Sequence, residues 1–220
     1  KPFKKKYTFR VPPEWGRALP NAGFDVMCLA NNHLMDYGEE GLISTLAVLD
    51  SLGVKHSGAG MARDEAAGPC FIERNGRKTA FFAYSLTYPM EFWASESGSG
   101  TAYPSAGDLK RRIQSAASGA DLVVVSFHWG GELMTEPKSY QRYYARAAVD
   151  AGADIVLGHH PHVLQGLEVY RGGIIAYSLG NFVFGSMSPN ARDSAILKIW
   201  NSPGSPLMAE VIPVSVYNAE

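Results

Sequence analysis

Residues 120–132 read ADLVVVSFHWGGE. The run LVVVSF at 122–127 is apolar apart from one serine and does not alternate, which is typical of a strand covered on both faces in a parallel sheet. The run DIVLG at 154–158 has the same character. Histidine follows each run, as His128 and as His159. Because reactive groups of α/β folds gather just past the carboxyl ends of parallel strands, these runs predict both the sheet and the place of a site.

Helical and β-rich segments alternate along the rest of the chain. Amphipathic helices are expected over residues 37–52, 105–118 and 137–151, and Asp36 with Glu39 three residues on is typical of a capping box. Further strands are expected over 24–30, 78–85, 164–170, 174–178, 195–200 and 208–216. The alternation predicts an α/β class with an added antiparallel portion, which includes a hairpin at Gly172–Gly173.

Length and composition bound the possible classes of protein. The chain has 220 residues, 46% of them hydrophobic, with a formal net charge of −1. This predicts one domain over residues 1–220, with a basic lead-in at 1–12 and a β-rich portion at 195–220. The near-zero charge argues against a nucleic-acid partner. No apolar run approaches the roughly 20 residues that cross a bilayer, and no targeting segment is recognisable.

The two cysteines do not form a multi-bridge framework. Cys28 lies in an apolar run and is expected to be a buried small hydrophobic side chain. A single bridge between Cys28 and Cys70 remains an open alternative.

Five of the six histidines follow expected strands, and only His56 does not, so His56 is expected to be structural. Imidazole is the commonest protein ligand for transition metals, and Asn or Asp oxygens complete harder sites. The candidate residues for one common metal centre are therefore the five remaining histidines and one asparagine: Asn32, His33, His128, His159, His160 and His162. Either the H-x-H pair His160 and His162 or the pair His159 and His162 would converge on this centre, and the spacing does not choose between them.

Each candidate also has a plainer interpretation. His128 suits a hydrogen-bonded core histidine, and Asn32 suits a residue that caps its own turn. Asp36 suits a helix cap, with orientation of His33 as the alternative. Glu132 and Asn181 lie in loops that contain glycine, where they would contact substrate or support the ligands.

Four motifs bring the chain to a known family. ANNHLMDYG at 30–38, SFHWGGE at 126–132, GHHPHVLQGLE at 158–168 and YSLGNFVFG at 177–185 closely resemble the bacterial capsule-synthesis protein family, typified by the poly-γ-glutamate synthesis proteins. The resemblance covers residues 7–184. It implies the fold of the calcineurin-like metallophosphoesterases, which is a two-sheet sandwich flanked by helices. The Gly-Asp strand and the Asn-x-Glu that open the family pattern do not appear before residue 30, so the chain is expected to lack the N-terminal strand and to be a piece of a longer protein.

The resemblance also implies roles for individual residues. Asn32 would bind metal through its carbonyl oxygen, His33 would act on the leaving group, and Asp36 would stand for the carboxylate that accompanies this pair. His128 would be a further metal ligand. Two of the three histidines His159, His160 and His162 would complete the set.

The function implied by the resemblance is a hydrolase-type enzyme with one or two divalent metals (Mn, Fe, Zn or Mg). Its substrate would be an anionic polymer or a small phospho or acyl compound, and its partners a membrane-associated synthesis machinery in the bacterial envelope. Two other hypotheses stay open: a non-catalytic assembly component, and a metal-independent acid/base enzyme that modifies peptides, such as an epimerase. Residues 84–93, with the SESGSG stretch that follows, are expected to be either a lid or a plain surface loop.

Overall fold

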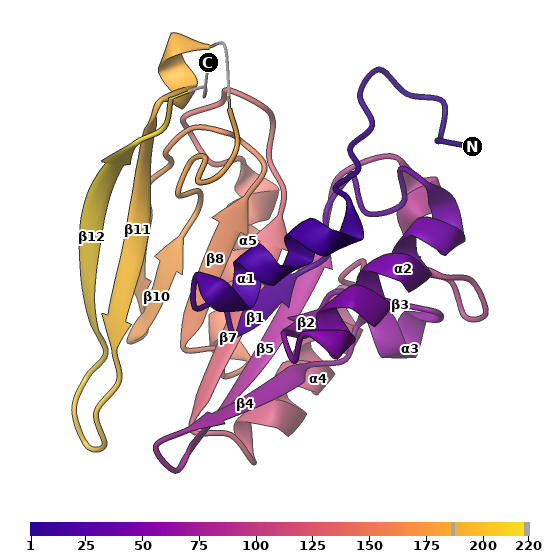
Figure 1. The fold of residues 1–220 in the computed structure, drawn as a ribbon. Coiled ribbons are helices and arrows are strands. Elements are labelled where there is room, and N and C mark those ends of the chain that lie inside the picture. The colour runs from indigo at the N-terminus through magenta and orange to yellow at the C-terminus, as the bar shows by residue number, and fades with distance from the viewer. Residues whose placement is uncertain (186–187, 218–220) are drawn as a thin grey trace.

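A six-stranded sheet with the order β4-β5-β7-β8-β10-β9 forms the centre of the computed structural model, which describes residues 1–185 and 188–217 (Figure 1). The four inner strands run parallel, and both edge strands run antiparallel to their neighbours. The strands of this sheet are β4 (Cys70–Arg74), β5 (Arg77–Ser85), β7 (Leu122–His128), β8 (Ile155–His159), β10 (Gly173–Ala176) and β9 (Leu167–Tyr170).

Three two-stranded sheets accompany this sheet. They are the parallel pair β1 (Val26–Cys28) and β2 (Lys55–Ser57), and the antiparallel pairs β3 (Ala59–Gly60) with β6 (Gly100–Thr101) and β11 (Asp193–Trp200) with β12 (Met208–Ser215). Strand β2 packs against β4 and β5, so the β1–β2 pair forms part of a second layer on the central sheet.

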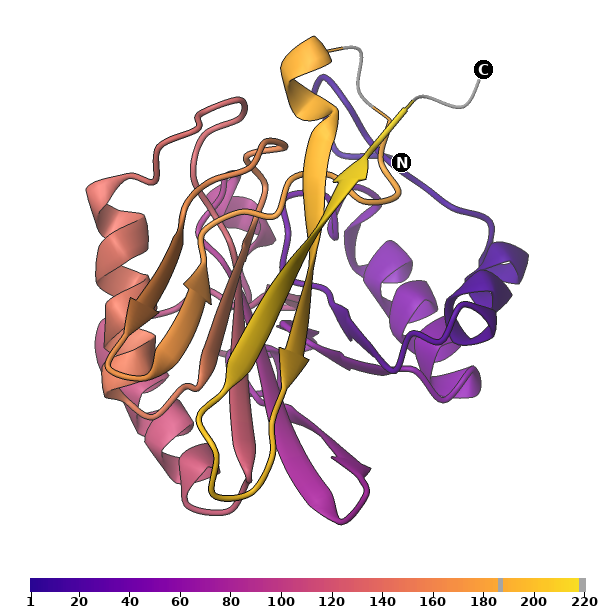
Figure 2. The ribbon, with the colours of Figure 1, turned by 90° about the vertical axis from the view of Figure 1, so that its left-hand side faces the viewer.

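Helices cover both outer sides of the sheets. Figures 1 and 2 show α4 and α5 behind the central sheet and α1 and α2 on the opposite side, outside β1 and β2. The helices are α1 (Ala18–Asn21), α2 (Gly38–Ser51), α3 (Arg63–Ala66), α4 (Ala106–Ala117) and α5 (Ser139–Asp150), with 3-10 turns at Pro13–Arg17, Met90–Phe92 and Pro189–Ala191. The expected α/β class, with helices on both sides of layered sheets, is therefore confirmed.

The apolar run of β7 explains why this strand lies at the centre. Residues 123–127 are all buried, because α4 and α5 cover one face of the strand and the second layer covers the other. On the α4/α5 face an aromatic row continues through Phe127, Trp129 and Tyr177, with ring centroids 4.6 and 6.1 Å apart. Trp129 has no solvent exposure, follows β7 directly, and donates its amide to the His159 carbonyl at the end of β8 at 3.0 Å.

The expected elements differ from the observed ones mainly at their ends. The three long helices and the eight expected strands are present, and Arg171 and Gly172 make the β9–β10 hairpin turn with positive φ. The strand expected over 164–170 begins only at Leu167, and the edge strand β4 was missed. Both cysteines are free thiols, and burial raises the pKa of Cys70 to about 12.

The capping box expected at Asp36 is wrong. Helix α2 begins at Gly38 after Tyr37, and no side chain caps its first turn. The Asp36 carboxylate faces His33 and the N-terminal segment instead. Within the described residues, no helix has the length and apolar character needed to cross a membrane.

Candidate functional site

The parallel strands β5, β7 and β8 end side by side, so the loops that follow them share one edge of the sheet. The register pairs Ser85 with His128, and His128 with His159. The turn after β1 reaches the same edge and brings Asn32 to His128, with 2.9 Å between Asn32 Oδ1 and His128 Nε2.

The two asparagines of the turn Asn31-Asn32-His33 have different roles. Asn31 holds the turn, because its Oδ1 accepts a hydrogen bond from the His33 amide at 2.7 Å and its Nδ2 donates to the Leu29 carbonyl at 3.2 Å. The Asn32 side chain is thereby free to face His128. Asn31, and not Asn32, takes the turn-capping role that sequence left open for Asn32.

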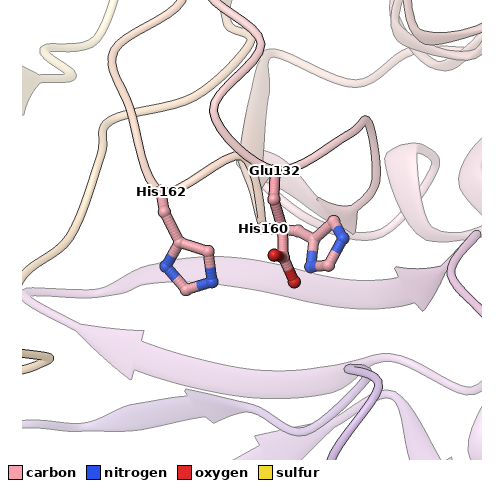
Figure 3. Close-up of side chains that lie close together, drawn as sticks. All are labelled: Glu132, His160 and His162. Carbon is pink, nitrogen blue, oxygen red and sulfur yellow. The ribbon is translucent and has the colours of Figure 1, made fainter. Parts of the chain in front are cut away.

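Three further side chains meet beside this pair. One ligand atom each of Glu132, His160 and His162 lies within 4.8 Å of the other two (Figure 3). The His160 ring also lies against His128, with centroids 4.7 Å apart. Of the two histidine pairs that the sequence allowed, His160 and His162 are the one that gathers with a carboxylate. His159 is outside this trio at the end of β8.

Both histidines of this pair have left-handed backbone conformations. His160 has a backbone φ of +95° and His162 a backbone φ of +60°. Residues other than glycine seldom occupy this region. Each such residue costs about 1–3 kcal/mol unless the surroundings hold it. The turn with Pro161 between the two histidines presents both imidazoles to one point.

This strain gives a prediction for folding stability. His160→Gly and His160→Ala both remove the imidazole, but only glycine tolerates φ +95° without cost. We expect the glycine variant to be more stable than the alanine variant by about 1 kcal/mol. Urea denaturation of the two variants side by side measures this difference, and equal midpoints would contradict the strain.

Other residues hold the site histidines in place. His162 Nδ1 lies 2.7 Å from Asn181 Oδ1, and Asn181 in turn donates to the Ala191 carbonyl at 3.2 Å. With Nδ1 engaged, Nε2 is the nitrogen of His162 that is available to a ligand. The Phe184 ring stacks on His162 at 4.8 Å and covers its outer face.

His33 and Asp36 form a second pair beside the trio. His33 Nδ1 lies 2.8 Å from Asp36 Oδ2, while the Asp36 side chain is only 1% exposed. The basic segment at residues 1–12 contacts this pair. Lys5 forms an ion pair with Asp36 Oδ1 at 2.6 Å, and the Phe9 amide donates a hydrogen bond to Asp36 Oδ2 at 2.7 Å. The buried carboxylate thus orients the His33 ring, and Phe9 packs on that ring at 4.3 Å.

The electrostatic environment keeps several imidazoles uncharged. Burial, followed by the neighbouring imidazoles, holds the pKa of His128 well below its usual value. Burial lowers the pKa of His160 to about 4, with a smaller contribution from His162 and opposition from Glu132. Burial alone lowers the pKa of His159 to about 4. Neutral imidazoles with free lone pairs are the form that binds metal ions near pH 7.

The donor set fits a divalent transition metal. Two imidazoles and one carboxylate come from the trio, and an amide oxygen and a third imidazole come from Asn32 and His128. Such a mixed N/O set is typical of Zn²⁺, Mn²⁺ and Fe²⁺ sites. The 2.9 Å between Asn32 Oδ1 and His128 Nε2 is close to the roughly 3 Å that separates two ligands of one ion when each lies about 2.1 Å from it.

A cavity of about 650 Å³ opens beside these donors. Its lining combines site residues with side chains that sequence analysis did not single out. The lining residues are Asn32, Leu86, Thr87, Tyr88, Tyr103, Gly130, Glu132, Lys138, Tyr140, Tyr144 and His160. Residues 86–88 belong to the segment expected to be a lid or a loop, and they form a wall of this cavity. Tyr140 and Tyr144 have the four-residue spacing of one helix face, which indicates packing and not a cavity, and a single lysine such as Lys138 forms no pattern, so the sequence did not reveal them as cavity residues.

Comparisons with known proteins agree with this architecture. Solved structures with the same fold include a putative 5'-nucleotidase from Staphylococcus aureus (TM-score 0.61, 16% identity, 94% of this chain and 41% of that one). They also include a phosphatase from Mycoplasma pneumoniae (TM-score 0.59, 14% identity, 90% of this chain and 74% of that one). The fold is therefore that of the calcineurin-like phosphoesterases, as the motifs implied.

Sequence relatives are more similar. The capsule biosynthesis protein CapA of Bacillus anthracis is 36% identical over 204 residues, which cover 91% of this chain and 50% of the relative. The PGA biosynthesis protein CapA of Bacillus subtilis is 36% identical over 216 residues, which cover 98% of this chain and 57% of the relative. The chain thus spans about half the length of these relatives. The model of the bacterial capsule synthesis protein family PGA_cap matches residues 1–186, and the chain belongs to this family.

Proposed function

We propose that this chain carries the catalytic centre of a metal-dependent hydrolase in capsule biosynthesis, acting on an anionic polymer or on a phospho or acyl substrate. The observation that carries the proposal is the convergence of Glu132, His160 and His162 beside the Asn32–His128 pair. A scaffold that only binds partners does not require buried neutral imidazoles and strained backbone at one point.

The chain's own residues have separable tasks in such a reaction. A divalent cation held by this donor set would polarise the substrate oxygen and acidify water. His33 is anchored through Nδ1 by Asp36, so its Nε2 is the atom that gives a proton to the leaving group. Lys5 and the Phe9 amide hold Asp36 in place and thereby fix the direction of the imidazole.

The relatives point to the class of substrate. The Bacillus subtilis relative is a PGA biosynthesis protein, and poly-γ-glutamate carries one free carboxylate on each residue. We therefore propose a glutamate polymer as the anionic substrate, the bacterial envelope as the compartment, and a membrane-associated synthesis machinery as partner.

Hydrolysis of bis-p-nitrophenyl phosphate and of oligo-γ-glutamate, with Mn²⁺ or with EDTA, tests the proposal in the full chain. We expect Mn²⁺-dependent turnover of at least one substrate, lowered about 100-fold in kcat by His33→Ala with metal content unchanged. His56→Ala, which removes an imidazole on β2 that is hydrogen-bonded to Asp50, outside the candidate site, should leave kcat unchanged.

Three other outcomes would change the proposal. Full activity in His33→Ala would remove the proton-donor role of His33. EDTA-insensitive incorporation of deuterium into a peptide would replace the hydrolase by a metal-independent acid/base enzyme. A protein that holds no metal and turns over neither substrate would favour an assembly role.

A further inference from the structure

The 650 Å³ cavity holds two charged side chains, Glu132 and Lys138, among its lining residues. Glu132 turns toward His160 and His162 (Figure 3), so its charge belongs to the candidate metal centre. Lys138 makes no ion pair with any described residue. The positive charge of Lys138 therefore has no partner in an ion pair within the described structure.

The position of Lys138 is fixed by its backbone, whereas its ammonium group stays accessible. The residue directly precedes α5, and its amide donates to Gln141 Oε1 at 2.9 Å. Gln141 is fully buried and donates to Gln165, which in turn donates to the Met134 carbonyl at 2.8 Å. This buried amide chain joins the Lys138 amide to the Met134 carbonyl and so holds the second half of the loop over residues 131–138, while Lys138 lines the cavity.

Hydroxyl groups line the rest of the cavity wall. The Tyr140 hydroxyl accepts a hydrogen bond from the Gly130 amide at 2.7 Å, which leaves its own proton free to donate. Burial raises the pKa of Tyr140 and of Tyr144, so both phenols stay protonated and act as donors. Tyr103, which also lines the cavity, stacks on Trp93 with 4.1 Å between the ring centroids. One ammonium and several phenol donors are a lining that suits an anion.

We propose that this cavity binds a second negatively charged group of the substrate, a carboxylate or a phosphoryl group, through Lys138 and the tyrosine hydroxyls. The inference rests on the proposed function, because it places this group beside the atoms that react at the metal centre. It assigns Lys138 as the residue that selects a substrate with at least two anionic groups over a neutral ester or amide.

Calorimetric binding of two charged probes to the full chain tests the assignment, first after EDTA treatment and then with Mn²⁺. The probes are N-acetylated tri-γ-glutamate, with the form in which every carboxyl group is a carboxamide as the neutral match, and glycerol 2-phosphate, with glycerol as the neutral match. Lys138→Met should weaken binding of a charged probe about tenfold and leave the neutral probes unaffected. Lys138→Arg should retain most of the affinity, and Lys110→Met, an exposed lysine on α4, should retain all of it.

The outcomes separate this inference from the function on which it rests. Lys138 dependence for tri-γ-glutamate alone assigns a carboxylate site, and dependence for glycerol 2-phosphate alone assigns a phosphoryl site. Charged-probe affinity that Lys138→Met leaves unchanged, or no binding of either charged probe, overturns the inference even if the protein binds Mn²⁺. Lys138-dependent binding in a protein that takes up no metal supports the anion site and contradicts the proposed metal centre.

Discussion

Replacing His160 and His162 together by alanine is expected to lower the affinity for Mn²⁺ about ten-thousand-fold. Loss of one outer-shell partner of a metal ligand already costs up to about 100-fold in affinity, and loss of a direct ligand costs at least as much. The double variant leaves one carboxylate from the trio, together with Asn32 and His128. Metal content by elemental analysis and Mn²⁺ titration by calorimetry measure the change.

His56→Ala is the matched control, because it removes an imidazole that lies on β2 and contacts Asp50, outside the candidate centre. It should bind Mn²⁺ as tightly as the unmodified protein. The two alanines replace side chains and leave the backbone conformation of the turn in place, so the double variant should stay folded, and its circular dichroism spectrum checks this. Equal Mn²⁺ affinity in the double variant and in the control would refute the metal centre at these histidines.

Gly158→Ala is expected to lower the free energy of unfolding by about 3 kcal/mol or more. A Cβ atom at this position would lie 1.9 Å from the Tyr177 carbonyl oxygen and 2.5 Å from Trp129 Nε1. These two atoms are themselves joined by a hydrogen bond of 2.9 Å. The added methyl group would therefore overlap both atoms and break this bond in the core. Neither backbone nor buried indole can move away cheaply, and such overpacking is among the most damaging substitutions.

Gly166→Ala provides the comparison, because a Cβ atom there would have no neighbour within 4 Å. Its unfolding free energy should stay within about 0.5 kcal/mol of the parent value. Guanidinium denaturation followed by fluorescence measures both variants. A Gly158→Ala protein as stable as Gly166→Ala would show that β8 and β10 can separate without cost.

Much of the fold could be predicted from the sequence, because the signals are local. The unbroken apolar run of β7 indicates burial on both faces, and the periodic leucines of α2 indicate a helix packed on one face. The short edge strand β4 carries no such pattern, since it has a half-exposed environment. The failed capping box at Asp36 has a tertiary cause: His33, Lys5 and the Phe9 amide compete for its carboxylate.

The candidate site could be predicted as a set of loops but not as a geometry. Strand order decides that His128 and His160 meet, and their separation of 32 residues in the chain says nothing of this. The choice between His159 and His160 depends on the left-handed backbone at His160 and His162, which spacing does not encode. Glu132 was expected only to contact substrate or to support the ligands, and its distance to both imidazoles makes it a candidate ligand itself.

The burial of Trp129 has a practical consequence for work in solution. Its indole is shielded from water and donates to the Tyr177 carbonyl at 2.9 Å, whereas Trp15 on the surface is 69% exposed. A shielded indole emits at shorter wavelength than a hydrated one. Trp129 directly follows His128 and is therefore an intrinsic fluorescent reporter of the candidate site. A paramagnetic ion bound at that site would quench its emission without any added label.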